Sequence, residues 1–286
     1  MKVNQFQPYI GHEEYESIKE CFDANWITEG PKAKEFSDKL CKLIGCKYGV
    51  FAPNGTLSLY LGLKAIGIGP GDEVIVPDFT FIASANAVEM VGATPIFVDI
   101  NRDTLHIDLE KCSDLITDNT KAIMPVHIYG TAVNMDSLME FARLHKLKVI
   151  EDAAQAIGVT WNGKHCGSFG DVSSFSFFAD KTITTGEGGF VCTNDKEIYT
   201  KLLYLRNQGR VNRGSFIHPE IGYNFRMTDI QCAIGLTQLN KLNDIIIKKQ
   251  NILQKYKNLL KDVDGIEIME PEELSNHIPF RVAIKF

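Results

Sequence analysis

One lysine, Lys181, lies in a sequence context that suits covalent chemistry with a carbonyl group. An apolar, strand-like run from Val172 to Phe178 precedes it, and a glycine-rich turn leads to a second run, Gly189 to Thr193. In a pocket, desolvation or a cationic neighbour lowers the pKa of a lysine, and the neutral amine can then attack a carbonyl carbon. Most lysines are solvated surface charges, so Lys181 alone is weak evidence for catalysis.

A carboxylate at the end of another strand-like run supports this interpretation. Val149 to Glu151 reads as a buried strand, and Asp152 follows at its carboxyl end, where open α/β sheets bind their ligands. Asp152 is either the N-cap of a following helix or the partner of the pyridine nitrogen of pyridoxal phosphate. In the second interpretation Lys181 forms the Schiff base, and the aspartate keeps the ring protonated so that it accepts electrons. With Lys181 downstream, the cofactor is favoured.

A third segment suits the binding of a phosphate group. The strand-like run Tyr48 to Ala52 is followed by Pro53-Asn54-Gly55-Thr56 and then by a helical pattern from Leu57 to Ile66. Backbone N–H groups and the positive end of a helix can receive an anion at such a junction. Asn-Gly-Thr before a helix is also an ordinary turn and cap, so this motif is weak on its own.

Taken together, these motifs resemble the DegT/StrS group of sugar aminotransferases, which are pyridoxal-phosphate enzymes of fold type I. The resemblance extends from about residue 8 to about residue 245, and the ordered set is far more specific than any member. The other segments that carry it are Trp26 to Pro31, Gly69 to Pro77, Ala93 to Asp99, Pro125 to Gly130, Glu151 to Gln155 and Ile221 to Met227.

The resemblance implies a role for each of eight residues. Lys181 is implied as the Schiff-base lysine and Asp152 as the partner of the pyridine nitrogen. Gln155 is implied to lie near the 3-hydroxyl of the cofactor, and Phe81 is implied to cover the face of its ring. Asn224 is implied to contact the phosphate from a neighbouring subunit, which predicts a homodimer with shared active sites.

Three further residues, Gly55, Thr56 and Ser176, are implied to contact the phosphate within the subunit. Asn54 stands where many members of the group have serine, which leaves its own contact open. No metal is implied. His127 has two interpretations, a contact with substrate or a satisfied core histidine, and it is left out of the catalytic set.

The implied reaction is transamination in two half-reactions, with the pyridoxamine form of the cofactor between them. An amino acid, by analogy glutamate, supplies the amino group to a keto-sugar, most often nucleotide-linked, for the biosynthesis of amino sugars and surface polysaccharides. One alternative is a sugar dehydratase of the same group, and some of these carry histidine at the position of Lys181. An aminotransferase for a small non-nucleotide keto substrate is a second alternative. A non-enzymatic relative would be expected to lose Lys181 or Asp152, and this chain keeps both.

Composition agrees with a cytoplasmic enzyme. The chain has 286 residues, a net charge of −6 and 44% hydrophobic residues, which suffices for a sizeable core. The negative charge argues against nucleic-acid and membrane-surface partners, and no apolar run reaches the ~18 residues of a membrane span. The first 14 residues lack the apolar region of a secretory signal. The seven cysteines are scattered without a C-x-x-C pair, which favours neither a zinc site nor disulfides.

Alternating strand and helix patterns predict an α/β fold with a mostly parallel sheet flanked by helices. We expect a large cofactor-binding domain over residues 1–230, including an N-terminal helical segment. Residues 231–286 are expected to form a long linking helix and a small, apparently truncated C-terminal α+β part. The helix should begin at Thr228, with Thr228 and Asp229 as cap residues, and run to about Lys261.

The predicted boundaries place strands at residues 48–52, 73–76, 95–99, 121–128, 147–151, 172–178, 189–193 and 266–269. The predicted helices before the linking helix cover residues 12–23, 32–44, 56–67, 80–91, 134–146 and 195–206. The polar segment 207–220 is the best candidate for a mobile loop.

Overall fold

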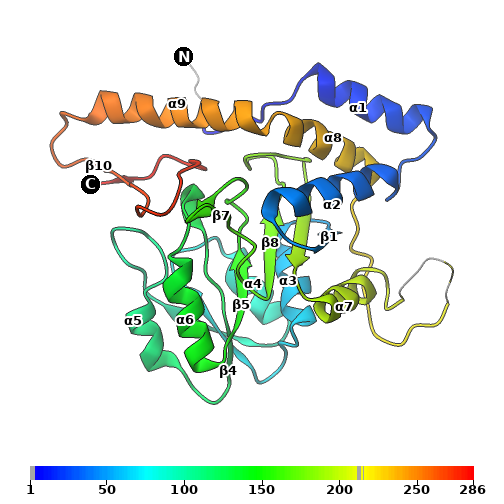
Figure 1. Cartoon of the computed structure of the whole chain (residues 1–286), viewed down its shortest axis with the longest axis horizontal. Helices are drawn as coiled ribbons and strands as arrows, with labels where there is room; N and C mark the ends of the chain where they lie inside the picture. Colours follow the sequence, from blue (N-terminus) through cyan, green and yellow to red (C-terminus); the bar gives the residue numbers. More distant parts are fainter. Residues whose placement is uncertain (1–3, 211–213, 215) are drawn as a thin grey trace.

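A seven-stranded sheet forms the centre of the computed structural model, which describes residues 4–210, 214 and 216–286. The strands are β1 (Tyr48–Ala52), β2 (Glu73–Pro77), β3 (Thr94–Val98), β4 (Thr120–Ile123), β5 (Lys148–Asp152), β8 (Val172–Ser176) and β9 (Gly189–Thr193). Their order across the sheet is β1-β9-β8-β5-β4-β2-β3. Figure 1 shows β5 and β8 near the centre of the molecule. All neighbours are parallel except that β9 runs antiparallel to β1 and β8. The predicted mostly parallel α/β sheet is therefore confirmed.

Side chains alternate between two apolar layers along each strand, as the strand period of two requires. On β1, Val50 and Ala52 join a cluster with α3 (Gly55–Ala65), α4 (Ala83–Met90) and α7 (Lys196–Arg206). Phe51 joins the cluster on the opposite side. That second cluster includes α2 (Pro31–Ile44), α6 (Met135–His145) and α8 (Asp229–Asn240). Because both faces are covered, the sheet is buried, and ligands can reach it only at its strand ends.

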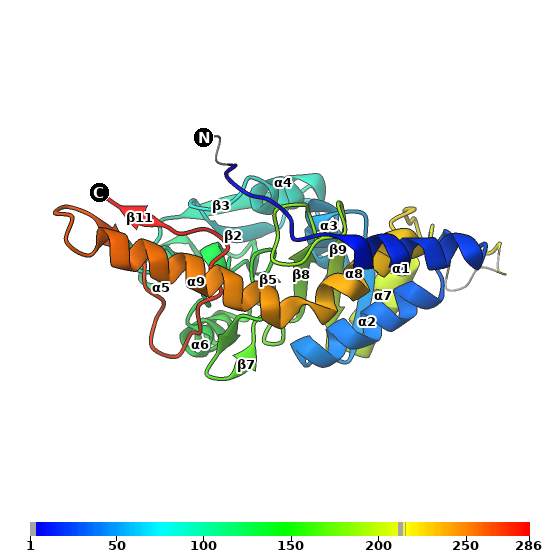
Figure 2. The same cartoon turned by 90° about the horizontal axis from the view of Figure 1, so that it is seen from above.

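The long helix predicted from Thr228 to Lys261 is wrong as a single element. The chain forms two helices, α8 and α9 (Leu242–Leu260), which are separated at Lys241 with φ −90° and ψ 0°. The amine of Lys241 pairs with Glu14 of α1 (His12–Asp23) at 2.8 Å. This tertiary contact lies at the bend between α8 and α9, where the sequence has no glycine or proline that would predict a bend. Figure 2 shows α8 and α9 end to end, with α1 beside α8.

The two predicted cap residues serve different helices. Thr228 caps α8, as predicted, because its hydroxyl accepts a hydrogen bond from the N–H of Gln231 at 3.2 Å. Asp229 instead caps α2, since its carboxylate accepts the N–H groups of Gly30 at 2.7 Å and Ala33 at 2.9 Å. The buried carboxylate therefore ties α8 to the positive end of α2.

Several predicted boundaries also differ from the structure. Strand β4 ends at residue 123 rather than 128, β8 ends at 176 rather than 178, and α4 begins at 83 rather than 80. At the two strand ends the apolar run continues into a turn, so apolar character alone overestimated the element. Part of the predicted mobile loop, residues 211–213 and 215, lies outside the described residues. The remaining short elements are α5 (Leu109–Cys112), the 3-10 turns Ser113–Leu115 and Ile128–Gly130, and the hairpin β6 (Thr160–Trp161) and β7 (Lys164–His165).

The C-terminal segment, defined as residues 270–286, turns back below α9 (red in Figure 1) and bonds to the 128–130 turn. Before it, β10 (Glu267–Ile268) pairs antiparallel with β11 (Ile284–Lys285). The N–H of Ile278 bonds the carbonyl of Gly130 at 3.0 Å, and the N–H of Phe280 bonds the carbonyl of Tyr129 at 3.0 Å. No described helix is long and apolar enough to cross a membrane. The domain division at residue 230 stays a prediction.

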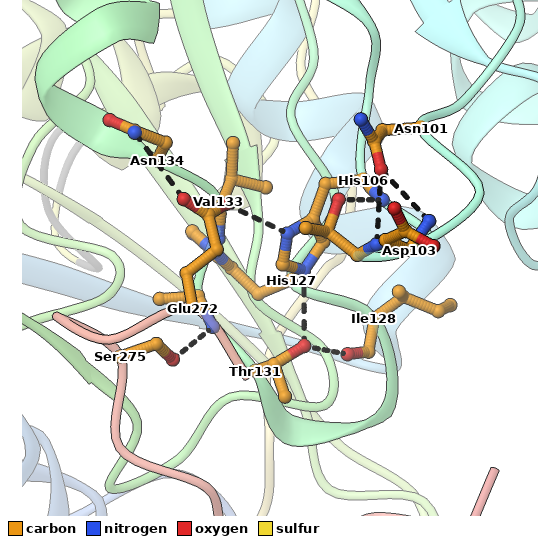
Figure 3. A network of polar contacts seen from close by, with 12 residues as sticks. Asn101, Asp103, His106, His127, Ile128, Thr131, Val133, Asn134, Glu272 and Ser275 are labelled. Carbon is orange, nitrogen blue, oxygen red and sulfur yellow. Dashed lines mark hydrogen bonds and ion pairs between the residues drawn. The ribbon is translucent and has the colours of Figure 1, made fainter. Parts of the chain in front are cut away.

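Polar side chains add to this docking (Figure 3). The hydroxyl of Ser275 accepts the N–H of Ala132 at 2.8 Å, and the carboxylate of Glu272 accepts the amide of Asn134 at 3.4 Å. His106 lies behind this contact, with one ring nitrogen 3.9 Å from Glu272. The C-terminal segment is thus held along its length by main-chain and side-chain bonds.

We predict that Gly130→Ala loosens the C-terminal segment. A Cβ atom at residue 130 would lie 1.8 Å from the carbonyl oxygen of Ile278, and φ is +83°. Gly163 is the matched control, because its φ is +76° but nothing lies within 4 Å of an added Cβ. Gly163→Ala should lower the free energy of unfolding by about 1–2 kcal/mol, the cost of a left-handed alanine. Gly130→Ala should lower it by at least about 3 kcal/mol, since a main-chain clash is added.

Urea unfolding measures both variants, and limited proteolysis should cleave residues 270–286 faster only in Gly130→Ala. Equal losses of stability, with unchanged proteolysis, would show that the close approach at Gly130 does not hold the segment.

Candidate active site

The candidate site lies at one edge of the sheet, where β5 and β8 end. In the parallel pair β5–β8, Asp152 is opposite Ser174, so Ser176 ends β8 at the same edge. In the antiparallel pair β8–β9, Ser176 is opposite Gly189. The connection from 177 to 188 therefore leaves and re-enters the sheet at this edge, and Lys181 lies on it.

One cavity of about 380 Å³ brings together seven of the eight residues implied by the sequence motifs. These seven come from segments that are far apart in the chain. They are Gly55, Thr56, Phe81, Asp152, Gln155, Ser176 and Lys181. The volume lies within the ~300–1,000 Å³ of small-molecule and cofactor sites.

Lys181 presents its amine to this cavity from a mostly buried position, with 15% of its side chain exposed. Burial lowers the pKa of Lys181 below its ordinary value, and the charge of Arg281 lowers it further. The carboxylates of Asp180 and Asp152 oppose this effect. The amine lies 3.9 Å from Asp180 and 4.5 Å from the centre of the Phe280 ring. It is thus a candidate nucleophile and proton carrier.

Asp152 is held as an acceptor at the end of β5. One carboxylate oxygen accepts the hydroxyl of Ser84 at 2.7 Å, and the other accepts the N–H of Ala154 at 3.1 Å. The side chain is buried. Turns rather than a helix follow at residues 153–159, so Asp152 is not a helix N-cap. A buried carboxylate that lines a cavity suits a cationic or protonated ligand group.

The first turn of α3 provides an anion-binding end. Asn54 caps the helix by accepting the N–H of Leu57 at 3.0 Å, while Gly55 and Thr56 line the cavity. The first N–H groups of a helix have no partner within the helix and attract an anion. A Cβ atom at Gly55 would lie 2.8 Å from Cβ of Ser176, so glycine permits the close approach of α3 and β8. These residues suit a phosphate group.

Gln155 and Phe81 lie at other parts of the cavity wall. The side-chain oxygen of Gln155 accepts the N–H of Tyr129 at 2.7 Å, which leaves its amide nitrogen as the donor. Tyr129 has a left-handed φ of 53°. Phe81 is 69% exposed and lies just before α4. Its ring can therefore cover a ligand without displacing core side chains.

Asn224 is the implied site residue that the structure places outside this cavity. Its side-chain oxygen accepts the Nε–H of Arg226 at 2.9 Å, and its main chain pairs with Asn207. The residue is exposed. The structure thus brings seven of the eight implied residues together and leaves Asn224 apart from them.

Five further residues at or beside the cavity were missed by the sequence interpretation. Ser84 orients Asp152, and Asp180 adjoins the lysine. The other three are Glu187, Phe280 and Arg281, of which the first two line the cavity and the third pairs with Asp180. Asp180 is adjacent to Lys181 in the sequence, so it could have been predicted to lie near the site. Glu187 lies on the same 177–188 connection as Lys181, and the other three reach the site only by folding.

His127 is a satisfied core histidine, which decides between its two interpretations. It is fully buried, and its Nδ1 accepts the N–H of Val133 at 3.2 Å (Figure 3). Its Nε2 therefore carries the proton and donates to Glu151 at 3.1 Å. Burial raises the pKa of Glu151, but the hydrogen bonds from His127, Gly170 and Gly167 outweigh it, so the pKa is lowered. The buried pair of His127 and Glu151 therefore supports the end of β5, where Asp152 lies.

The described residues contain no cluster of three or more histidine, cysteine, aspartate or glutamate side chains suited to a metal ion. All seven cysteines are free thiols.

Comparison with known proteins agrees with the geometry. The model of the DegT/DnrJ/EryC1/StrS aminotransferase family matches residues 8–286. GDP-perosamine synthase of Caulobacter vibrioides is 45% identical over 260 residues, which cover 91% of this chain and 70% of that protein. Spore coat polysaccharide biosynthesis protein SpsC of Bacillus subtilis is 38% identical over 279 residues, which cover 93% of this chain and 72% of that protein.

A solved structure extends the comparison to the fold. The aminotransferase TlmJ from Streptoalloteichus hindustanus superposes with a TM-score of 0.95 at 29% identity, covering 99% of this chain and 78% of that one. The fold type I class expected from the motifs is confirmed. The chain belongs to the DegT/DnrJ/EryC1/StrS aminotransferase family.

Proposed function

We propose that the protein is a pyridoxal-phosphate-dependent aminotransferase that moves an amino group from an amino acid to a keto-sugar. The observation that carries this proposal is the convergence of seven motif residues on one cavity. Family membership supports the reaction class. Lysine rather than histidine at position 181 favours transamination over sugar dehydration.

The residues present fit the cofactor. Lys181 would hold its aldehyde carbon, Asp152 its pyridine nitrogen, and the end of α3 with Ser176 its phosphate. Gln155 would donate to its 3-hydroxyl, and Phe81 would cover its ring. When bound, the cofactor supplies an electron sink for the carbon that gains or loses the amino group. Each proposed protein contact thus suits the charge of the part of the cofactor that it would hold.

Each protein group then has a defined task. The amine of Lys181, whose pKa is lowered mainly by burial, can accept and return a proton at Nζ. The carboxylate of Asp152 keeps a proton on the ring nitrogen, and Ser84 keeps that carboxylate in place. Burial of both side chains excludes water, which strengthens these interactions.

We further propose that the acceptor is a nucleotide-linked keto-sugar and that glutamate is the donor. The names GDP-perosamine synthase and spore coat polysaccharide biosynthesis protein support a role in amino sugars for surface polysaccharides. A cytoplasmic location and the absence of nucleic-acid partners stay predictions. A panel of nucleotide-linked keto-sugars, assayed with glutamate, tests the substrate class.

The active unit is proposed to be a homodimer with shared sites. Asn224 is exposed and lies outside the cavity of its own chain, which supports a contact in trans. Tyr223 and Phe225, on either side of it, are aromatic residues of the kind enriched at interfaces.

Replacing Lys181 tests the centre of the proposal. Lys181→Ala should lower turnover by at least about a hundredfold, the smaller contribution expected of a general acid–base. Borohydride reduction and peptide mapping should place the cofactor on Lys181 in the unchanged protein. Lys121→Ala, at an exposed position, is the control and should keep both activity and labelling. Reduced cofactor on a different lysine would overturn the assignment.

Replacing Asp152 tests the electron sink. Asp152→Asn keeps a side chain that can still bond Ser84 and Ala154, so the cavity should keep its shape. We expect cofactor to remain bound while turnover falls about a hundredfold. Losing a carboxylate commonly lowers the pKa of its cationic partner, here the pyridine nitrogen, by ~2 units, and each unit lowers the protonated fraction about tenfold. Stopped-flow absorbance measures the half-reaction with glutamate. Turnover close to that of the unchanged protein would refute the role of Asp152.

Subunit complementation tests the shared site. Lys181→Ala and Asn224→Asp proteins should each be inactive, the second because a carboxylate would face the cofactor phosphate. After exchange of equal amounts, about half of the dimers should be mixed, each with one intact site. Activity should therefore return. Asn258→Asp, at an exposed position on α9, controls for the added charge. If native mass spectrometry proves exchange and activity stays absent, the sites are not shared.

A further inference from the structure

Asp180 lies between two cations and contacts them with different oxygens. One oxygen accepts a hydrogen bond from Arg281 at 2.9 Å. The other lies 3.9 Å from the amine of Lys181 and has no hydrogen-bond partner among the described residues. The Asp180 side chain is only 16% exposed. A buried carboxylate oxygen without a partner favours the nearest cation, which here is the lysine.

Arg281 reaches this position through the C-terminal segment. The bond from Phe280 to Tyr129 fixes the main chain just before it. The guanidinium lies 4.3 Å from the centre of the Phe280 ring, and Lys181 lies 4.5 Å from the same ring. Phe280 thus stands beside both cations. A second cavity of about 700 Å³ begins behind this group and shares Asp180, Lys181 and Phe280 with the first.

Other charged groups face the same place from both cavities. Asp152 and Glu187 line the first cavity, and Lys248, Lys249, Tyr9 and Tyr256 line the second. Burial and, to a smaller extent, the charge of Arg281 lower the pKa of Lys249 to about 8, although Asp180 opposes this. Of these groups, only Asp180 forms an ion pair with Lys181 among the described residues. The charge state of Lys181 therefore depends on how strongly Asp180 is already paired with Arg281.

We propose that Arg281 is a positioning residue that holds the Asp180 carboxylate in an ion pair and so keeps the amine of Lys181 from being locked as a cation. This inference rests on the proposed role of Lys181 in the reaction. Arg281 does not touch the reacting atoms itself. It acts by occupying the carboxylate that would otherwise pair with the lysine.

The charges predict the direction in which the pKa of Lys181 moves in each variant. Without Arg281, Asp180 would be an uncompensated carboxylate beside Lys181, and the pKa of the lysine would rise. More of the amine would then be protonated at a given pH, and less could attack a carbonyl. Without Asp180, the pKa of Lys181 would fall. Removing both charges together should place the pKa between those of the two single variants, because one cation and one anion leave the same neighbourhood.

Pulse labelling of the full chain with acetic anhydride tests the proposal after any bound cofactor has been removed. The labelled fraction of the Lys181 peptide is measured by mass spectrometry across about pH 6 to 11, a range that brackets a lysine pKa lowered from its ordinary value. In Arg281→Gln the midpoint should move to higher pH, and labelling at about pH 8 should fall about tenfold, the effect of one unit of pKa. In Asp180→Asn the midpoint should move to lower pH. The plateau at high pH reports access to the amine and separates opening of the cavity from a change of charge.

Three controls complete the test. Arg281→Lys keeps the charge and should keep the midpoint, and the midpoint of the double variant Asp180→Asn, Arg281→Gln should lie between those of the two single variants. Lys148→Gln removes an exposed cation that pairs with Asp171 and should change nothing. An unmoved midpoint in folded Arg281→Gln, or a double variant that behaves like Arg281→Gln alone, would overturn the proposal. Since no cofactor takes part, this result is independent of whether borohydride trapping confirms the proposed function.

Discussion

Burial of two successive carboxylates at the end of β5 is the constraint on which the rest of the site depends. A buried carboxylate is tolerated only if hydrogen bonds or cations satisfy it. Glu151 is satisfied by the N–H groups of Gly167, Phe169 and Gly170 and by His127. Asp152, one residue later, points to the other side and keeps part of its surface in the cavity. The carboxylate of Glu151 thus holds the surrounding loops in place, and the carboxylate of Asp152 remains available to a ligand in the cavity.

The bonds to Glu151 also connect the cavity to the C-terminal segment. His127 begins the turn that contains Tyr129, and Tyr129 bonds both Gln155 in the cavity wall and Phe280 in the C-terminal segment. Phe280 in turn packs against Lys181. These contacts form a continuous series from Glu151 to the amine of Lys181. A change in the C-terminal segment can therefore reach the amine of Lys181 through these contacts.

Local patterns predicted those parts of the molecule that local physics decides. Apolar runs revealed the central strands, and Asp152 and Lys181 stood out because a charged residue directly follows or separates buried runs. The bend at Lys241 escaped prediction because its partner, Glu14, is more than two hundred residues away in the chain. Arg281 escaped for the same reason, since a lone arginine after a phenylalanine carries no sign of a distant aspartate. Most residues that converge on the cavity were visible in the sequence, but the charge balance around Lys181 was not.

The ladder between the C-terminal segment and the 128–130 turn has a consequence for how this region can change. Ile278 and Phe280 bond to successive carbonyls through their own N–H groups, so the main chain rather than any side chain sets the alignment. Changes of side chain at Ile278 and Phe280 themselves leave such an alignment in place. An insertion or deletion of one residue between 275 and 280 would reverse which side chains face the sheet and would carry Phe280 away from the lysine. The length of this segment is therefore constrained more strictly than its residue types, and a natural variant should differ here by replacement rather than by a gap.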